Sequence, residues 1–243
     1  HKAIRRQRQM CIRDRRSAAA LFSARQQVAQ VLNCAPKEVF FTSGGSEADN
    51  QALISAAALG KKQGKCHIVS TAMEHHAILH TLEALQAEGF TVTLLHPQAD
   101  GIVTATQVAE AITDNTCLVS VMYANNETGS IQPIREIGAL CRKHGVLFHT
   151  DAVQAAGHLA IDVQRDNIDM LSLSAHKFHG PKGIGLLFAK SNIQLTSLIR
   201  GGGQERGKRA GTENLPGIIG LTVALKDAQE NMQQNTAYIT GLR

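Results

Sequence analysis

The residue with the most distinctive chemical setting is Lys177. It follows the apolar segment 170–174, stands beside His176, and precedes a turn-forming stretch that begins at Gly180. We expect the apolar segment to be a buried strand, so that Lys177 leaves it where there is little water. Desolvation favours the neutral amine, which is the form that attacks a carbonyl to make a Schiff base. The position therefore predicts a nucleophilic lysine.

A second candidate is Asp151, which comes directly after the apolar segment 146–150 and three residues before Gln154. A carboxylate at the end of a buried strand is costly unless it has a cationic partner. A protonated pyridine nitrogen would be such a partner. Capping of a following helix explains an aspartate at this position equally well.

The sequence Gly44-Gly45-Ser46 follows the apolar segment 38–41 and precedes a helical pattern. Two glycines let the backbone approach a ligand, and the free N–H groups at the start of a helix bind anions. Ordinary N-capping by Ser46 is the better explanation when this motif is taken alone. The segment is not a P-loop, because no Gly-Lys-Ser/Thr follows at the required spacing.

Two further polar residues also follow expected strands. His75 comes after the segment 66–70, where an imidazole can stack on a flat ring or move protons. A metal site at His76 and His80 would lack a nearby third ligand, and a pair of surface histidines is the simpler interpretation. Asn126 follows the segment 117–123, and its amide could bind a ligand or serve the turn.

From residue 17 onward, short apolar segments alternate with amphipathic ones. We expect strands at 38–41, 66–70, 90–95, 117–123, 146–150, 170–174 and 184–189, and helices at 18–32, 47–59, 76–87, 105–112, 134–143 and 215–242. This alternation predicts an α/β fold with a mainly parallel sheet sandwiched by helices. Ligands of such sheets bind at the carboxyl ends of the strands, which is where the polar motifs fall.

Taken in order, these motifs fit the cofactor pyridoxal 5'-phosphate. It needs an anion site for its phosphate, a carboxylate that holds its pyridine nitrogen protonated, and a lysine that bonds its aldehyde. The start of the helix after Gly45, Asp151 and Lys177 would meet these needs.

The motifs together resemble the cysteine desulfurases, in the nitrogenase-associated (NifS-like) and general iron–sulfur branch of the class V aminotransferases. The resemblance runs from about residue 17 to 243, and its motifs are FTSGGSEADN at 41–50, EH at 74–75, ANNETG at 124–129, HTDAVQ at 149–154, SAHK at 174–177 and GGGQERGKRAGTEN at 201–214. It implies the large domain of pyridoxal-phosphate enzymes of fold type I.

The resemblance also assigns roles to single residues. Lys177 would be the Schiff-base lysine and, with His75, would move protons. The cofactor would be held by Gly45, Ser46, His75, Asn126, Asp151, Gln154, Ser174, His176 and Lys177. Thr212 matches a residue that reaches the phosphate bound by the other subunit, which implies a homodimer. No metal is implied.

The implied reaction converts L-cysteine to L-alanine and an enzyme-bound persulfide, which passes sulfur to an iron–sulfur scaffold protein. Selenocysteine lyase, another class V enzyme, or a catalytically dead assembly partner are the alternatives. The family's N-terminal Ala-Thr-Thr stretch has no counterpart here. Its catalytic cysteine and substrate-binding arginine would follow Arg243, in a missing C-terminal small domain. We therefore expect an inactive fragment, with the cofactor-binding domain at 17–243.

Residues 1–16 form a separate expectation. Met10 to Asp14 match the translation of a transposon-end oligonucleotide, so 1–16 would be adapter-derived or a disordered arm. Seven basic residues and one acid lie there, so this segment contributes +6, the formal charge of the whole chain is +5, and the near-neutral remainder shows no nucleic-acid footprint. No apolar run approaches the ~18 residues that cross a bilayer. Five cysteines without a CxxC pair fit a reducing cytoplasm.

Overall fold

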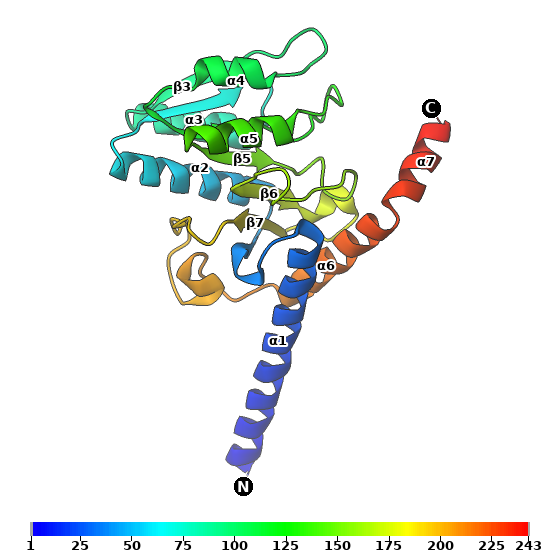
Figure 1. Ribbon diagram of the computed structural model, residues 1–243. Coiled ribbons are helices and arrows are strands. Elements are labelled where there is room, and N and C mark those ends of the chain that lie inside the picture. Colours follow the sequence, from blue (N-terminus) through cyan, green and yellow to red (C-terminus); the bar gives the residue numbers. More distant parts are fainter. Residues whose placement is uncertain (1, 243) are drawn as a thin grey trace.

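The computed structural model describes the backbone of residues 2–242 and the side chains of residues 15–242. Helix α1 (Lys2–Leu32) begins well before the expected position 18 and projects from the body of the molecule (Figure 1). Most side chains of the segment 1–16 lie outside the described residues. Its adapter-derived or disordered origin therefore stays a prediction, although its backbone from Lys2 on is part of α1.

The centre of the fold is a seven-stranded sheet in the order β1-β7-β6-β5-β4-β2-β3. The strands are β1 (Val39–Thr42), β2 (His67–Thr71), β3 (Thr91–Leu95), β4 (Thr116–Ser120), β5 (Leu147–Asp151), β6 (Met170–Ser174) and β7 (Gly185–Ala189). Only β7 runs opposite to its neighbours, pairing antiparallel with both β1 and β6. The expected mainly parallel sheet is confirmed, and the carboxyl ends of β1, β2, β4, β5 and β6 share one edge.

Helices cover both faces of the sheet, as expected (Figure 1). They are α2 (Gly45–Lys62), α3 (His76–Ala87), α4 (Ala105–Ala111), α5 (Ile134–His144), α6 (Leu215–Glu230) and α7 (Met232–Leu242), with short 3-10 turns η1 (Pro36–Glu38), η2 (Ala175–Phe178) and η3 (Gln204–Gly207). One buried cluster joins α2 and α3 to Phe40 and Leu118, and the other joins α1, α5 and α6 to Phe41 and Val119. Successive strand residues thus point to opposite cores.

Local sequence explains where several helices start and stop. Thr104 and Gln107 form a capping box at the start of α4. Gly145 ends α5 in the left-handed region, at φ 63°, where a side chain would be strained. The expected single helix over 215–242 is instead two helices, because the side chain of Asn231 bonds to Asp227 and the chain turns there.

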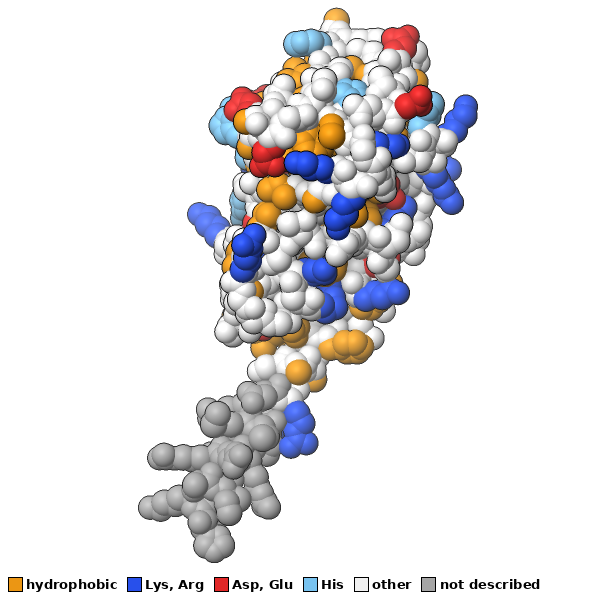
Figure 2. Space-filling model, turned by 90° about the vertical axis from the view of Figure 1, so that its left-hand side faces the viewer, with side chains coloured by type: hydrophobic (Ala, Val, Ile, Leu, Met, Phe, Trp, Pro, Cys, Tyr) orange, Lys and Arg blue, Asp and Glu red, His pale blue; other side chains and the backbone are white. Residues whose placement is uncertain are grey.

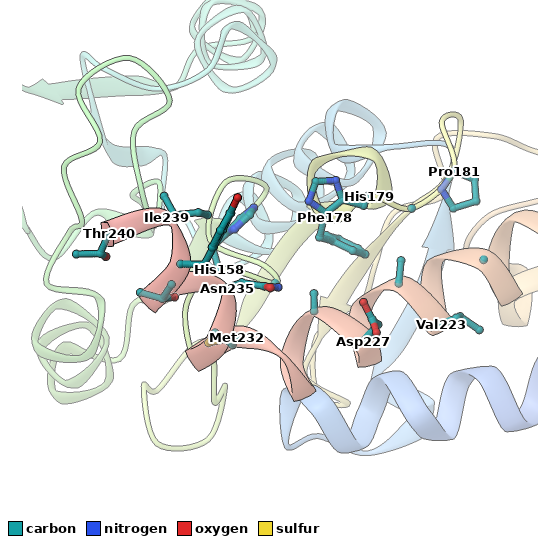
Figure 3. Close-up of a pocket in the computed structure, with 17 residues that line it drawn as sticks. His158, Phe178, His179, Pro181, Val223, Asp227, Met232, Asn235, Ile239 and Thr240 are labelled. Atoms are coloured by element: carbon teal, nitrogen blue, oxygen red, sulfur yellow. The ribbon is translucent and has the colours of Figure 1, made fainter. Parts of the chain in front are cut away.

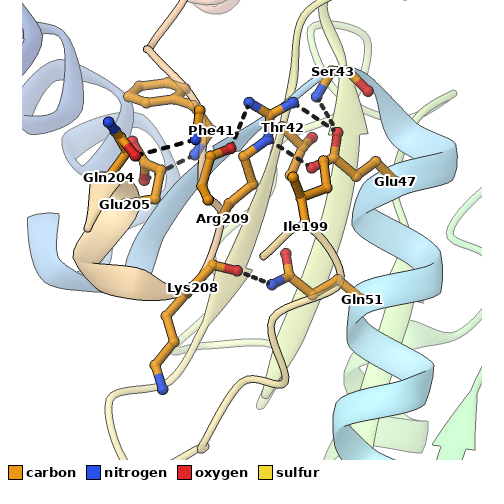
Figure 4. A network of polar contacts seen from close by, with 12 residues as sticks. Phe41, Thr42, Ser43, Glu47, Gln51, Ile199, Gln204, Glu205, Lys208 and Arg209 are labelled. Atoms are coloured by element: carbon orange, nitrogen blue, oxygen red, sulfur yellow. Dashed lines mark hydrogen bonds and ion pairs between the residues drawn. The ribbon is translucent and has the colours of Figure 1, made fainter. Parts of the chain in front are cut away.

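The glycine-rich segment 201–214 is tied to β1 and α2 by charged contacts (Figure 4). Arg25 makes a two-point ion pair with Glu205, at 2.9 and 2.6 Å, and Glu205 also accepts from the N–H of Phe41. Arg209 contacts Glu47 in the first turn of α2, at 2.9 Å. Glu205 adopts a left-handed backbone at φ 45°. Strain of this kind persists where surrounding contacts hold it, and the buried ion pair supplies them.

On the face shown in Figure 2, Lys and Arg side chains are spread among hydrophobic and uncharged ones. None of the helices that the structure describes is long and apolar enough to cross a bilayer.

Candidate active site

A cavity of about 240 Å³ lies at the carboxyl edge of the sheet. Nine of the ten residues assigned from the sequence line it, namely Gly45, Ser46, His75, Asn126, Asp151, Gln154, Ser174, His176 and Lys177; Asp49, Met122 and Val153 complete the lining. These residues come from the ends of β1, β2, β4, β5 and β6 or the turns after them. The parallel strands therefore bring together groups that lie up to 132 positions apart, from Gly45 to Lys177.

One part of the cavity is suited to an anion. Helix α2 starts at Gly45, so the first N–H groups of this helix have no acceptor within it and carry its positive dipole end. The Ser174 hydroxyl, 3.0 Å from His176 Nδ1, adds further donors beside this helix start. A Cβ on Gly45 would lie 2.7 Å from Val153, so a side chain there would have to displace the lining.

The alternative reading of Ser46 as an ordinary N-cap is wrong. Gly44 holds the cap position without a side-chain bond, and Ser46 lies inside the first turn with its side chain exposed. Ser46 lines the cavity.

Asp151 is the last residue of β5 and is only 5% exposed. No helix follows it, so the helix-cap explanation fails; one carboxylate oxygen accepts from the N–H of Val153, at 2.9 Å, in a tight turn. Burial raises the pKa of Asp151, while the Val153 N–H and the charges of His75 and Lys177 lower it in part. The carboxyl thus lies within the electrostatic reach of both proposed proton-transfer groups.

Lys177 lies in η2, immediately after β6. Its side chain is exposed. The expectation that Lys177 leaves its strand where there is little water is therefore wrong. Lys177 is exposed because it lies at the edge of the sheet, where the chain leaves the core. Its backbone is fixed there by contacts, whereas its side chain extends into solvent. The carbonyl of Lys177 lies 3.2 Å from His158 Nε2, which anchors the turn from behind.

His75 caps α3, and its Nδ1 accepts from the N–H of Ala77 at 3.1 Å. Because Nδ1 is the acceptor, the proton of a neutral ring sits on Nε2, which is left free to serve the cavity. The rings of His76 and His80 lie nearby, with centres 5.3 Å apart and planes tilted by 52°. Among the residues that the structure describes, no group of three potential ligands could hold a metal ion.

The two adjacent asparagines, Asn125 and Asn126, have different roles. Asn125 builds the turn, because its side-chain oxygen accepts from the N–H groups of Glu127 and Thr128, both at 2.9 Å. Asn126 is exposed and lines the cavity, as does Gln154 from the β5 side. The turn-forming role considered for Asn126 therefore belongs to its neighbour.

Thr212 is the one assigned residue that the structure leaves outside the cavity. It is exposed and lines a separate, small hollow with Thr42 and Arg209. Its role toward a second subunit stays a prediction.

Sequence reasoning missed two buried acids beside the cavity. Asp49 lies one turn into α2 and lines the cavity, and Glu74 lies in the turn after β2. Burial raises the pKa of Glu74 to about 8, although it accepts from Thr71 Oγ1 and from the N–H of Met122. Burial, and then the charge of Asp151, raises the pKa of Asp49 well above its usual range. The three-residue spacing from Ser46 to Asp49, a helical repeat, was the available signal.

Three cysteines are held as thiols by their surroundings. Burial raises the pKa of Cys34 and of Cys141 to about 12 and that of Cys117 to about 11. None of them lines the cavity. A thiol with so high a pKa is a poor nucleophile at neutral pH.

A larger hollow, of about 1190 Å³, lies between α6–α7 and the turns on the far side of η2 (Figure 3). Its lining includes Val223 and Ile239, which are 61% and 59% exposed, and it shares no residue with the cavity at the sheet edge. The hollow holds none of the assigned groups.

The buried Glu74 predicts a specific pH dependence of stability. The folded chain keeps the Glu74 proton up to about pH 8, whereas the unfolded chain loses it near pH 4.5. Between these values the folded state binds more protons, so its free energy of unfolding falls as the pH rises, by up to about 1.4 kcal/mol per pH unit. Glu74→Gln should reduce that slope in urea unfolding at pH 5 to 8.

The matched control is Glu83→Gln in the exposed part of α3, which should keep the wild-type slope. Equal slopes for the wild type and Glu74→Gln would show that Glu74 is ionised in the folded chain.

The chain is similar to known proteins in both sequence and structure. The model of the family "Aminotransferase class-V" matches residues 4–241. The cysteine desulfurase IscS of Clostridium botulinum is 55% identical over 220 residues, covering 90% of this chain and 55% of the relative. The chain thus spans about half the length of this curated relative.

Two solved structures share the fold. One, described as SspA in complex with cysteine, has a TM-score of 0.85 and 45% identity, over 88% of this chain and 62% of that one. The other, a NifS-like protein, has a TM-score of 0.87 and 37% identity, over 93% and 65%. The expected resemblance and the fold-type-I large domain are confirmed, and the chain belongs to the class V aminotransferase family.

Proposed function

We propose that the chain holds the pyridoxal-phosphate site of a cysteine desulfurase. The observation that carries the proposal is that Lys177, Asp151 and the start of α2 all line one cavity. A nucleophile, a buried acid and an anion-binding helix start are the three features that this cofactor requires.

The lining fits the cofactor in its chemistry. The helix start at Gly45, with Ser46, Ser174 and His176, offers donors for a phosphate. Asp151 is a buried carboxyl whose nearest charged groups, His75 and Lys177, are exposed side chains, so a ring cation at the cavity would be its natural buried partner. The amides of Asn126 and Gln154 remain for the ring substituents.

When bound, pyridoxal phosphate supplies an electron sink for the substrate carbanion. Lys177 would hold the cofactor through Nζ and would move a proton to and from the substrate. His75 would contact the ring and exchange a proton at Nε2, since its Nδ1 accepts from the N–H of Ala77. Asp151 would be the partner of the protonated pyridine nitrogen.

The proposed substrate is L-cysteine, which the names of the relatives and the cysteine complex of a structural neighbour support. In the reaction, an enzyme thiolate attacks the substrate sulfur, the carbon–sulfur bond breaks, and the carbon takes a proton. The products are L-alanine and an enzyme persulfide, so atoms and charge balance. We propose that the thiol comes from outside the described residues of this chain, because none of its described cysteines, Cys34, Cys66, Cys117 and Cys141, lines the cavity.

The persulfide sulfur would pass to an iron–sulfur scaffold protein. A homodimer would place Thr212, which lies outside its own cavity, at the phosphate of the other subunit. Free thiols at Cys34, Cys66, Cys117 and Cys141 support work in a reducing cytoplasm.

Lys177→Ala should abolish covalent cofactor attachment, because Lys177 is the lysine that lines the cavity. The holoprotein is reduced with borohydride, digested, and the pyridoxyl-bearing peptide identified by mass. Lys182→Ala, which removes a neighbouring exposed lysine, should keep the label at Lys177. A label on Lys182 or Lys190 would refute the assignment.

Sulfide release tests the activity itself. The 243-residue chain should release no sulfide from L-cysteine with a reductant present, because none of its described cysteines lines the cavity. A chimera in which the C-terminal part of the Clostridium botulinum relative follows Arg243 should release sulfide and alanine in equal amounts.

Two results would count against the proposal. A chimera that binds pyridoxal phosphate but releases no sulfide would exclude desulfuration. Release by the chain alone, at the rate of the chimera, would mean that one of its own cysteines is the nucleophile.

A further inference from the structure

Asp49 and Asp151 line the same cavity from different elements, α2 and β5. Asp49 is 1% exposed, and its Oδ1 has no hydrogen-bond partner among the described residues. Nε2 of His149 lies 3.7 Å from this oxygen, which is too far for a hydrogen bond. A buried, unpartnered carboxylate oxygen is expensive, so the ionisation state of Asp49 has to be explained.

The surroundings of Asp49 are acidic. The charges that act on it come from Asp151 and Glu74, which are themselves buried. His149 cannot compensate, because burial lowers its pKa to about 3 and its ring is neutral. That ring is held between the hydroxyls of Ser120, at 2.9 Å, and Ser172, at 3.0 Å.

Like charges in a common buried site cannot all be ionised. The charges of His75 and Lys177 act on Asp151 in the direction that favours its ionised form, and both side chains are exposed and line the cavity. Asp151 is therefore the acid that keeps its charge most easily, and Asp49, deeper in the site, is the one that keeps its proton.

We propose that Asp49 is a positioning residue that stays protonated beside Asp151, so that one negative charge, and not two, faces the cofactor ring and the proton-transfer groups. A second carboxylate beside Asp151 would add a like charge to a buried site in which no buried cation faces the acids among the described residues. A neutral Asp49 leaves the single charge of Asp151 to face the ring nitrogen. The role of Asp49 toward the cofactor rests on the proposed function, whereas the statement that Asp49 is protonated does not.

The test uses the chain without cofactor, so that it is independent of the proposed reaction. Infrared difference spectra are recorded at pH 7 for Asp49→Asn against its parent, with Glu74→Gln in both chains to remove the other acid with a raised pKa. The parent should show the C=O band of a protonated carboxyl, shifted in D₂O, and Asp49→Asn should lose it. A purely structural role would not produce this band.

Asp169, which pairs with Lys190 at 2.7 Å, provides the matched control. Asp169→Asn should leave the protonated-carboxyl band in place. Loss of a carboxylate band in Asp49→Asn, in place of the protonated band, would overturn the proposal. Failure of Asp49→Asn to fold would also overturn it, because Asn is a neutral group of the same shape as a neutral Asp.

If the protonated band is present but the chain binds no pyridoxal phosphate, the proposed function fails and the proton assignment stands. If the cofactor binds at Lys177 and the band is absent, the assignment fails and the proposed function stands. The two claims are therefore separable.

Discussion

The cost of burying negative charge organises this site. Three acids, Asp49, Glu74 and Asp151, are each no more than 6% exposed and lie in or beside one cavity. No buried cation faces them among the residues described, and the ring of His149 is neutral. Such a cluster is tolerable only if some acids keep protons and a cation enters from outside. A cofactor with a protonated ring nitrogen meets the second condition.

The fold supplies the geometry for this arrangement. The parallel strands end at one edge of the sheet. Residues in the turns after them, such as His75, Asn126 and Lys177, line the cavity and keep their side chains exposed. The network beneath the cavity then fixes these turns: Glu74 binds the N–H of Met122, and His149 links the hydroxyls of β4 and β6 across β5. The hydrogen bonds of Glu74 and His149 hold these segments in place, and neither group adds a charge while it is neutral.

Much of this architecture could be predicted from sequence. Strand and helix positions follow from hydrophobic period, and the functional motifs come after strands because the fold type requires it. Boundaries were less accurate: β4 ends at Ser120, three residues before the expected end, because the turn with Glu74 takes over there. The exposure of Lys177 and the burial of Asp49 depend on packing between distant segments. The helical spacing from Ser46 to Asp49 indicates that the two residues share a face, but it does not indicate how deeply Asp49 is buried.

The central claim is that Asp151 is the carboxylate that holds the ring nitrogen of the cofactor protonated. It is tested most directly by the nitrogen-15 NMR shift of ring-labelled pyridoxal phosphate bound to the chain. In the wild type the ring nitrogen should show the shift of a protonated pyridine, and in Asp151→Asn that of an unprotonated one. A protonated nitrogen in Asp151→Asn would contradict the account.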